Sequence, residues 1–336
     1  MNRLYPMKFH PLLKERLWGG DKLHKMFNIN VKKQARFGEA WLLSGVDGSE
    51  TIVSNGWLAD NNLAELTEVF MGDLVGDKTY DVFKNQFPLL FKLIDAHEDL
   101  SIQVHPNDTL AQKRGLKNGK TEMWYIMQAE QDAQLISGFN KTINKESFEK
   151  LLTQNRLETV LNYEKVIAGD VFFMPSGRIH SIGKGILLAE IQQSSDTTYR
   201  IYDWNRTDDD GNPRPLHIAE SLDAIDFQVQ TDYKTHYSTE EDKTSPIIQS
   251  PCFTTNILNA HTPVRKNFSE LDSFVVYLCV EGSFSVSYDG EITTVHAGEI
   301  LLIPNVITEL IIVPTPMVKA LEVFMGNYYS FDFAEC

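Results

Sequence analysis

Cysteine is scarce in this chain, and so are positive charge and long apolar runs. Three cysteines (Cys252, Cys279 and Cys336) stand among 336 residues, too few and too late in the chain for a disulfide framework. No apolar run approaches the roughly 20 residues that span a bilayer, and no signal peptide is visible in the first residues. These absences predict a cytoplasmic protein without a membrane partner.

The formal net charge is -15, and this acidic excess argues against two classes of partner. Nucleic acid and anionic membrane surfaces attract basic proteins, so neither is expected to bind here. A small anionic substrate would need a local basic pocket that works against the field of the whole chain. The length allows one large or two medium domains with sizeable cores, and we expect a monomer or homodimer.

The pattern of apolar residues predicts a mainly β fold with a few peripheral helices. Helical spacing recurs near residues 61–70, 147–152, 157–161 and 216–224. The expected strands before residue 210 include 38–44, 87–94, 100–104, 121–127, 134–136, 186–192 and 198–204. After Pro251, short β-prone runs alternate with turns such as Asp289-Gly290, which is the strongest short signal for a hairpin.

Two parts of the chain share one pattern. Residues 168–175 and 297–304 both read alanine, glycine, an acidic residue, four apolar residues and proline. The first stretch continues to His180, whereas the aligned position after the second is Glu309. We therefore predict two β-barrels of one type. Residues 1–228 would form a metal-binding catalytic barrel with helical additions, 229–250 a polar linker, and 251–336 a degenerate barrel without the histidine.

The most informative residues are Gln103, His105, Lys120, Glu122 and His180. Alternation along a strand sends residues i and i+2 to the same face. Gln103 should therefore point the same way as His105, and Lys120 the same way as Glu122. If the flanking strands share a barrel, two imidazoles, a carboxylate and an amide oxygen can converge beside a lysine. Such ligands suit zinc, but they would also accept Mn, Fe, Co or Ni.

These residues resemble the motifs of the cupin superfamily, whose members are double-stranded β-helix (jelly-roll) barrels with a metal inside. More closely, the chain is similar to the type I mannose-6-phosphate isomerases in their short bacterial form. The segments that carry the resemblance are Arg16–Gly20, Gly38–Trp41, Phe87–Leu90, Asp99–Asp108, Gly119–Trp124, Pro175–His180, Ser195–Arg200 and Arg214–His217. The resemblance is strong to about residue 227 and weak afterwards.

The resemblance also implies roles for individual residues. It implies one zinc ion per chain, held by Gln103, His105, Glu122 and His180. The resemblance implies that Lys120, Glu190 and Arg200 are catalytic. It also implies that Lys120, Arg200 and Arg206 bind the substrate. Arg206 falls where some longer relatives carry a lysine.

The implied reaction interconverts mannose 6-phosphate and fructose 6-phosphate, a step of mannose metabolism. A proton moves between C1 and C2 through an enediol(ate), and zinc stabilises the negative oxygen as a Lewis acid. Lys120 and Arg200 would provide the basic pocket for the phosphosugar, since a guanidinium donates two parallel hydrogen bonds to phosphate. The sequence leaves the base open: it is either Glu190 or metal-bound water or hydroxide.

Several alternatives stay open at this point. Gln103 could merely hydrogen-bond near the metal, and Lys120 could belong to an exposed turn. Arg200 could pair with Asp196 or Asp203 in a purely structural ion pair. The rival functions are another cupin metalloenzyme, either a different sugar-phosphate isomerase or an iron dioxygenase, and a non-catalytic cupin that binds sugar.

Overall fold

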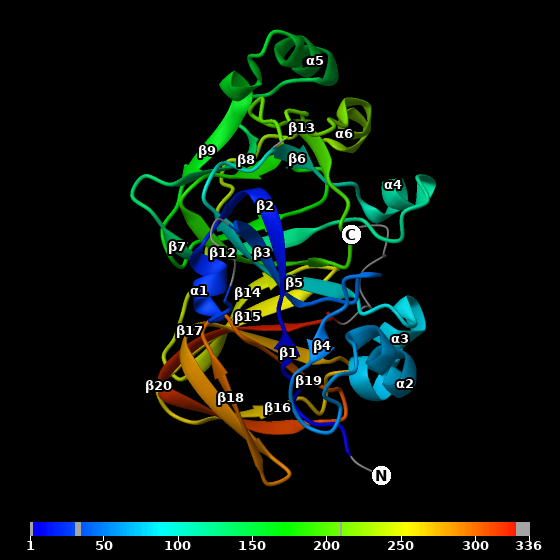
Figure 1. Cartoon of the computed structure of the whole chain (residues 1–336), viewed down its shortest axis with the longest axis vertical. Helices are drawn as coiled ribbons and strands as arrows, with labels where there is room; N and C mark the ends of the chain where they lie inside the picture. The colour runs from blue at the N-terminus through cyan, green and yellow to red at the C-terminus, as the bar shows by residue number, and fades with distance from the viewer. Residues whose placement is uncertain (1–2, 31–34, 209, 327–336) are drawn as a thin grey trace. The chain divides into compact units, whose positions relative to one another are not determined.

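The computed structural model describes residues 3–30, 35–208 and 210–326. Its helices are α1 (Lys22–Met26), α2 (Leu63–Val75), α3 (Asp77–Phe83), α4 (Asp108–Lys113), α5 (Lys145–Thr153), the 3-10 helix η1 (Leu157–Val160) and α6 (Ile218–Ala224). Its strands up to residue 210 are β1 (Phe9–His10), β2 (Leu12–Gly20), β3 (Phe37–Leu43), β4 (Ile52–Val53), β5 (Leu89–Ala96), β6 (Ile102–Val104), β7 (Glu122–Ala129), β8 (Gln134–Phe139), β9 (Leu161–Lys165), β10 (Val171–Met174), β11 (His180–Ile182), β12 (Ile186–Gln193) and β13 (Tyr199–Tyr202). The later strands are β14 (Lys243–Gln249), β15 (Thr254–Ala260), β16 (Val264–Asn267), β17 (Val275–Tyr288), β18 (Glu291–His296), β19 (Ile300–Ile303) and β20 (Glu309–Phe324). Strands dominate (Figure 1), so the prediction of a mainly β fold is confirmed.

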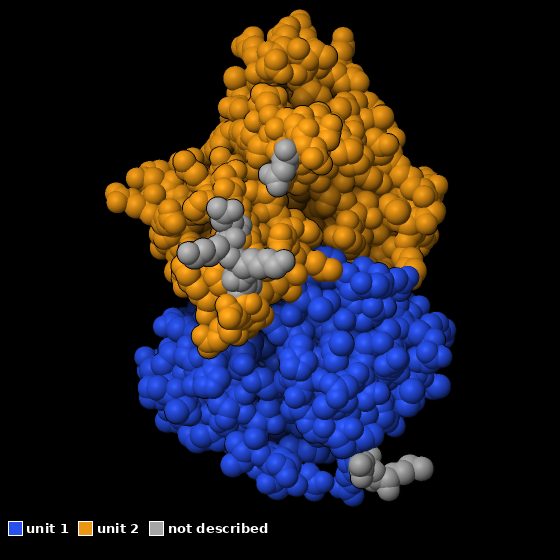
Figure 2. Space-filling view, in the orientation of Figure 1, with its two compact units in different colours: residues 1–12, 40–92, 236–333 blue, residues 13–39, 93–235, 334–336 orange. Residues whose placement is uncertain are grey.

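Two compact units divide the chain (Figure 2). Unit 1 comprises residues 1–12, 40–92 and 236–333, and unit 2 comprises residues 13–39, 93–235 and 334–336. The units interleave along the chain, whereas the sequence predicts successive segments. The boundaries at 1–228, 229–250 and 251–336 therefore stay a prediction. The last part of the predicted linker is strand β14, which pairs antiparallel with β15.

Two sheets that face each other hold the residues of interest. One sheet has six strands in the order β10-β7-β12-β5-β2-β3, and the other has five in the order β13-β6-β11-β8-β9. A shared core joins them, in which Trp124, Phe172 and Leu188 of the first sheet pack with Leu135 and Ile182 of the second. Side chains on the inner faces of both sheets are therefore brought close together.

Helices cover the other face of the five-stranded sheet. Ile102 of β6, Phe139 of β8 and Ile201 of β13 pack there against Phe148 of α5 and Leu222 of α6, and both helices lie on that outer side in Figure 1. Asn144 begins α5 by accepting a hydrogen bond from the backbone N–H of Ser147, as an N-cap residue does. The sheet is thus buried on both faces, which fixes its register.

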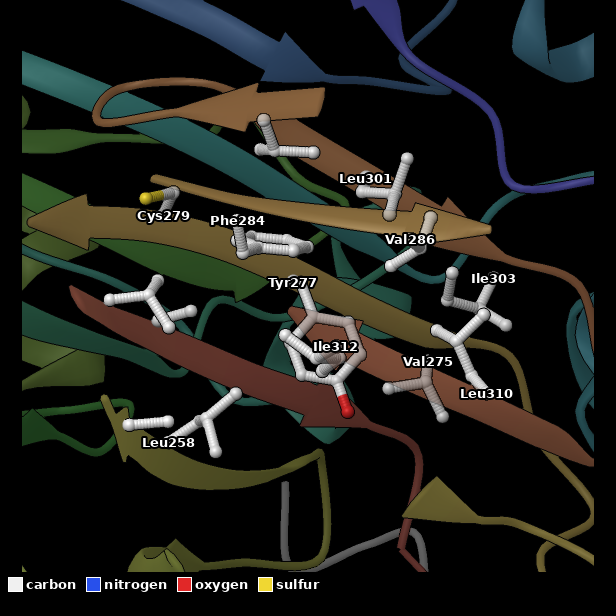
Figure 3. Close-up of a cluster of buried hydrophobic side chains, with 14 of the residues drawn as sticks. Leu258, Val275, Tyr277, Cys279, Phe284, Val286, Leu301, Ile303, Leu310 and Ile312 are labelled. Carbon is white, nitrogen blue, oxygen red and sulfur yellow. The ribbon is translucent and has the colours of Figure 1, made fainter. Parts of the chain in front are cut away.

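The seven-stranded sheet of unit 1 has its own core. Its strands run β14-β15-β20-β17-β18, with β16 paired to β20 and β19 paired to β17. Figure 3 shows the apolar side chains of β17, such as Val275 and Val286, gathered with those of neighbouring strands. Tyr277 lies among them and donates its hydroxyl to the buried carboxylate of Glu322, which satisfies a polar group that would otherwise be costly to bury.

Several local predictions are confirmed. The predicted helix near 61–70 is α2, and Asn62 and Glu65 form a capping box at its start. The predicted hairpin joins β17 to β18 through Asp289 and Gly290, both of which have positive φ, as a type I′ turn requires. The helix expected at 157–161 is only the single-turn η1, because the chain enters β9 at Leu161.

Cys252 and Cys279 are buried, and Cys336 lies outside the described residues. Burial raises the pKa of the Cys279 thiol to about 12, so this thiol stays protonated at neutral pH. None of the described helices is long and apolar enough to cross a membrane.

Two glycines of the N-terminal motifs allow strands β2 and β3 to approach closely. A Cβ built on Gly19 would lie closer than 3.0 Å to the backbone of Gly38, and a Cβ built on Gly38 would lie closer than 3.0 Å to the ring of Trp18. Real Cβ atoms essentially never approach so closely. A side chain at either position would force the backbones apart or displace a buried tryptophan.

Gly19→Ala should therefore destabilise the protein. Overpacking of this kind costs about 1–3 kcal/mol, and we expect the Tm measured by circular dichroism to fall by several degrees. Gly326→Ala is a matched control, because the nearest atom to its new Cβ is 3.5 Å away. Equal Tm values for the two variants would show that β2 and β3 can separate without cost.

Candidate metal centre

Strand register places three side chains in one row on the inner face of the five-stranded sheet. His180 of β11 lies opposite Gln103 of β6, and Gln103 lies opposite Arg200 of β13. Directly paired residues of antiparallel strands project to the same face. The facing sheet contributes Glu122 at the first position of β7, and His105 follows β6.

His105, Glu122 and His180 form one buried cluster. One carboxylate oxygen of Glu122 lies 3.5 Å from His105 Nε2, and the other lies 3.4 Å from His180 Nε2. The ligand atoms of all three residues lie within 4.8 Å of one another, and the three side chains are at most 2% exposed. Within the described part of the chain, no other group of three His, Cys, Asp or Glu residues is close enough to hold a metal ion.

Backbone carbonyls fix the tautomer of both imidazoles. His105 Nδ1 lies 3.0 Å from the carbonyl of Thr197, and His180 Nδ1 lies 2.8 Å from the carbonyl of Arg178. A carbonyl can only accept, so each Nδ1 carries a proton, and in the neutral imidazole the lone pair is then on Nε2. Histidines that ligate metals are held in this way.

The electrostatics of the cluster also favour metal binding. Burial is the main cause that lowers the pKa of His180 to about 3, and the nearby ammonium of Lys120 lowers it further. The imidazole is therefore neutral at physiological pH, which is the state that binds a metal. Two imidazole Nε2 atoms and a carboxylate fit a divalent first-row ion such as zinc.

Gln103 reaches the cluster of His105, Glu122 and His180 with the amide at the end of its side chain. Its Nε2 atom lies 3.3 Å from His180 Nε2, and its Oε1 atom lies 3.5 Å from Ser101 Oγ. The two ends of an amide are interchangeable by rotation about the last side-chain bond. The amide is therefore within reach of the cluster, and its role as a ligand stays a prediction.

Lys120 is not part of an exposed turn, because it is buried against the cluster. Its Nζ atom lies 2.7 Å from Glu122 Oε2 and 3.1 Å from His105 Nε2. Burial disfavours the ammonium, but the carboxylates of Glu122 and Glu190 outweigh burial and raise the pKa of Lys120. The residue is therefore a buried cation and a hydrogen-bond donor.

Glu190 lies on the same sheet face as Glu122, two residue pairs further along β7 and β12. It pairs with Trp124 across β12 and β7, and the indole Nε1 donates to its Oε2 at 3.0 Å. Its Oε1 lies 4.0 Å from Lys120 Nζ, and the side chain is buried. One carboxylate oxygen is thus held by tryptophan while the other is directed toward the lysine.

Arg200 does not form the ion pair with Asp203 that the sequence left open. Asp203 instead accepts from Arg206 Nη2 at 2.6 Å and from Arg214 Nε at 2.7 Å. Arg200 is half-buried, and its Nη1 donates to the carbonyl of Pro215 at 2.9 Å. Burial is the main cause that lowers the pKa of Arg200, and the neighbouring charges of Arg214 and Arg206 lower it further. Two guanidinium groups therefore share the carboxylate of Asp203, and Arg200 lies near them without bonding to it.

One residue on this face received no role from the sequence. Gln192 lies directly opposite Glu122 and is fully buried. Its Nε2 donates to the carbonyls of Gln193 and Ser195, and its Oε1 has no hydrogen-bond partner among the described residues. Strand alternation from Glu190 was the available signal, but alternation does not show which polar atoms lack a partner.

Comparisons with known proteins agree on one family. A family model described as the catalytic domain of type I phosphomannose isomerase matches residues 7–151. The chain is 35% identical over 305 residues to mannose-6-phosphate isomerase ManA of Bacillus subtilis (strain 168), which covers 89% of this chain and 93% of that protein. It is 33% identical over 303 residues to the mannose-6-phosphate isomerase of Streptococcus mutans, with 90% and 93% covered.

Solved structures show the same fold. The crystal structure of the mannose 6-phosphate isomerase from Bacillus subtilis matches with a TM-score of 0.83 and 30% identity, over 95% of this chain and 99% of that chain. A mutant phosphomannose isomerase from Salmonella typhimurium matches with a TM-score of 0.78 at 15% identity, over 96% of this chain and 100% of that chain. At that identity the second match supports the fold alone.

The fold and the site together define a mainly β protein with a buried His–Glu–His cluster suited to a divalent metal. With relatives of this identity and coverage, the chain belongs to the type I phosphomannose isomerase family. The resemblance seen in the sequence motifs is confirmed.

Glu122→Gln should nearly abolish metal binding, because it removes the only carboxylate of the cluster while keeping its size. We expect the affinity for Zn²⁺ to fall by more than the roughly 10- to 100-fold that outer partners of a metal site contribute. Competition with a chromophoric chelator measures this directly.

Glu309→Gln is the matched control for that variant. Glu309 begins β20 as His180 begins β11, but its carboxylate is exposed and accepts from Arg265. Its loss should leave zinc affinity unchanged. If Glu122→Gln bound Zn²⁺ as tightly as the control, the cluster could not be the metal site.

Proposed function

We propose that this protein is a zinc-dependent mannose-6-phosphate isomerase that interconverts D-mannose 6-phosphate and D-fructose 6-phosphate. The observation that carries the proposal is the buried cluster of His105, Glu122 and His180 with Lys120 bonded into it. Family membership supplies the substrate class, because full-length relatives carry this name.

In the proposed site, Gln103, His105, Glu122 and His180 would hold one zinc ion. When bound there, zinc would act as a Lewis acid toward the oxygens of the sugar and favour the enediol(ate) form. The sheets exclude water from His105, Glu122 and His180, which are buried, whereas Gln103 is half-buried. Their protonation states match the task, because the Nε2 lone pairs are available while Nδ1 is held by the backbone.

Lys120 and Glu190 are proposed to handle charge and protons. Lys120 would stabilise negative charge that develops on a substrate oxygen, since it is a buried cation. Glu190 would carry the proton between C2 and C1 through its Oε1, because its Oε2 is occupied by the indole of Trp124. Isomerisation needs one group that removes a proton and returns it to the neighbouring carbon, and a carboxylate can do both.

The arginine group is proposed to bind the phosphate. Arg200 shares the inner face with Gln103, and Arg206 and Arg214 are both held by Asp203. Three guanidinium groups around one carboxylate leave a local positive excess, which a dianionic substrate needs in a chain of net charge -15. Arg200 and Arg206 are the substrate contacts that we propose.

We also propose that the sheets close into two cupin-type barrels. The metal-binding barrel would lie within residues 1–228, and the barrel within 251–336 would lack a metal because Glu309 stands where the pattern has His180. A backbone similarity between the two repeated segments supports two barrels of one type: Gly169 and Gly298 both adopt positive φ just before β10 and β19. A cytoplasmic monomer or homodimer completes the proposal.

A coupled assay tests the function. Fructose 6-phosphate formed from mannose 6-phosphate is measured on the protein as isolated, after chelation and after return of Zn²⁺. We expect turnover that is lost with chelator and restored by zinc. Zinc binding without turnover would favour a non-catalytic sugar-binding protein, and oxygen consumption with iron would favour a dioxygenase.

Arg200→Ala should separate substrate binding from metal binding. We expect zinc affinity to stay near that of the parent protein while kcat/KM falls by about 100-fold, as when one oriented donor to a charged transition state is removed. Arg265→Ala is the matched control, because Arg265 is an exposed arginine paired with Glu309. Near-normal kinetics for Arg200→Ala would remove this residue from the site.

A further inference from the structure

One glutamine side chain bonds simultaneously to two segments next to the metal cluster. Gln193 ends β12 and lies on the face opposite to Gln192. Its Oε1 accepts from the backbone N–H of Thr121 at 2.8 Å, and its Nε2 donates to both carboxylate oxygens of Asp108 at 3.2 and 3.1 Å. The donor–acceptor assignment is fixed, since a backbone N–H only donates and a carboxylate only accepts.

Asp108 extends this connection to a further backbone group. Its Oδ1 also accepts from the backbone N–H of Gly119 at 2.6 Å, and the backbone N–H of Lys120 donates to the carbonyl of Pro106 at 3.0 Å. The two segments are in close contact, because a Cβ on Gly119 would lie closer than 3.0 Å to the backbone of Asp108. Gln193 and Asp108 therefore clamp residues 119–121 against residues 106–108.

These bonds lie beside the residues of the metal cluster. Thr121 separates Lys120 from Glu122, and Asp108 comes three residues after His105. Glu190 comes three residues before Gln193 on the same strand. The clamp thus ties together the three chain segments that carry His105, the pair of Lys120 and Glu122, and Glu190. Among the described residues, the side chains of Gln193 and Asp108 form no hydrogen bond to a side chain of the cluster.

We propose that Gln193 and Asp108 are positioning residues that hold Lys120 and Glu122 in place against His105. The amide accepts from Thr121 and donates to Asp108 at once, which neither a carboxylate nor an ammonium group could do. Gln193 is only 7% exposed, so water competes little for these bonds. The prediction for kinetics rests on the proposed isomerase function, whereas the prediction for zinc affinity does not.

An exchange of donor and acceptor tests the proposal. Gln193→Glu keeps an acceptor for Thr121 but faces Asp108 with a second carboxylate. Asp108→Asn keeps an acceptor for Gly119 but faces the amide of Gln193 with a second donor. The double variant Gln193→Glu/Asp108→Asn restores one donor and one acceptor with reversed direction, at the same total charge as the parent protein.

We expect each single variant to bind Zn²⁺ about 10- to 100-fold more weakly than the parent, as is typical when the outer partners of a metal site are lost. The double variant should recover most of that loss. Affinity is measured on the full chain by competition with a chromophoric chelator. At saturating zinc, kcat should fall in the single variants with little change in KM, and should recover in the double variant.

Gly19→Ala separates this role from general stability, because it should lower Tm without touching the clamp. Its zinc affinity should match that of the parent. If Gln193→Glu does not fold, Gln193→Met removes both bonds without adding a charge and should weaken zinc binding to the same extent.

Single variants with the zinc affinity of the parent would overturn the proposal, and so would a double variant no better than the worse single. Equal loss of affinity in Gly19→Ala would also overturn it, since the effect would then follow stability alone. If the parent shows no isomerase activity, the proposed function fails, and zinc affinity still decides whether the clamp positions the cluster.

Discussion

A buried carboxylate is the constraint on which the rest of unit 2 depends. Glu122 is fully buried, and an ionised carboxylate in an apolar interior costs several kcal/mol unless it is compensated. Lys120 at 2.7 Å offsets part of that cost, and the Nε2 atoms of His105 and His180 lie on either side. A divalent cation would compensate the charge more fully, because it would be bonded to the carboxylate and to both lone pairs. Burial of the Glu122 carboxylate is costly without a cation, and for the same reason the site favours binding of a cation.

The fold assembles this site from distant segments by strand register. Gln103, His180 and Arg200 become neighbours only because β6 lies between β11 and β13. Glu122 reaches them from a different sheet, so the site depends on the packing of two sheets through the core around Trp124 and Leu135. Trp124 belongs to this core and also supports the site, since its ring contacts His180 and its indole N–H donates a hydrogen bond to Glu190. Loss of the core packing would therefore separate the ligands as well as lower stability.

The sequence predicts well those features that depend on local periodicity. Alternation placed Lys120 with Glu122, and it led to the strand that carries Glu190, because a strand repeats every two residues wherever it lies. Motif spacing indicated which histidines meet, although the registers that bring them together are not local properties. The pairing of Asp203 with Arg206 and Arg214 could not be predicted, since seven charged residues between positions 200 and 214 allow several ion pairs of similar energy. The strand β14 was missed for a related reason: its polar residues resemble a linker, and the sheet supplies its partners.

Along each strand that carries the site, side chains that face inward alternate with side chains that face outward, and the two sets have different roles. Residues that face inward supply the reactive groups, and their outward neighbours fix the backbone between them. Ser181, next to His180, donates its hydroxyl to the carbonyl of Leu100 at 2.7 Å and so ties β11 to the start of β6. Thr121, next to Glu122, accepts from the backbone N–H of Ser176 at 3.2 Å. Because inward groups must keep atoms available to a ligand, part of the hydrogen bonding that holds the backbone between them comes from the other face. The polar outward residues beside the ligands are therefore as much a part of the site as the ligands themselves.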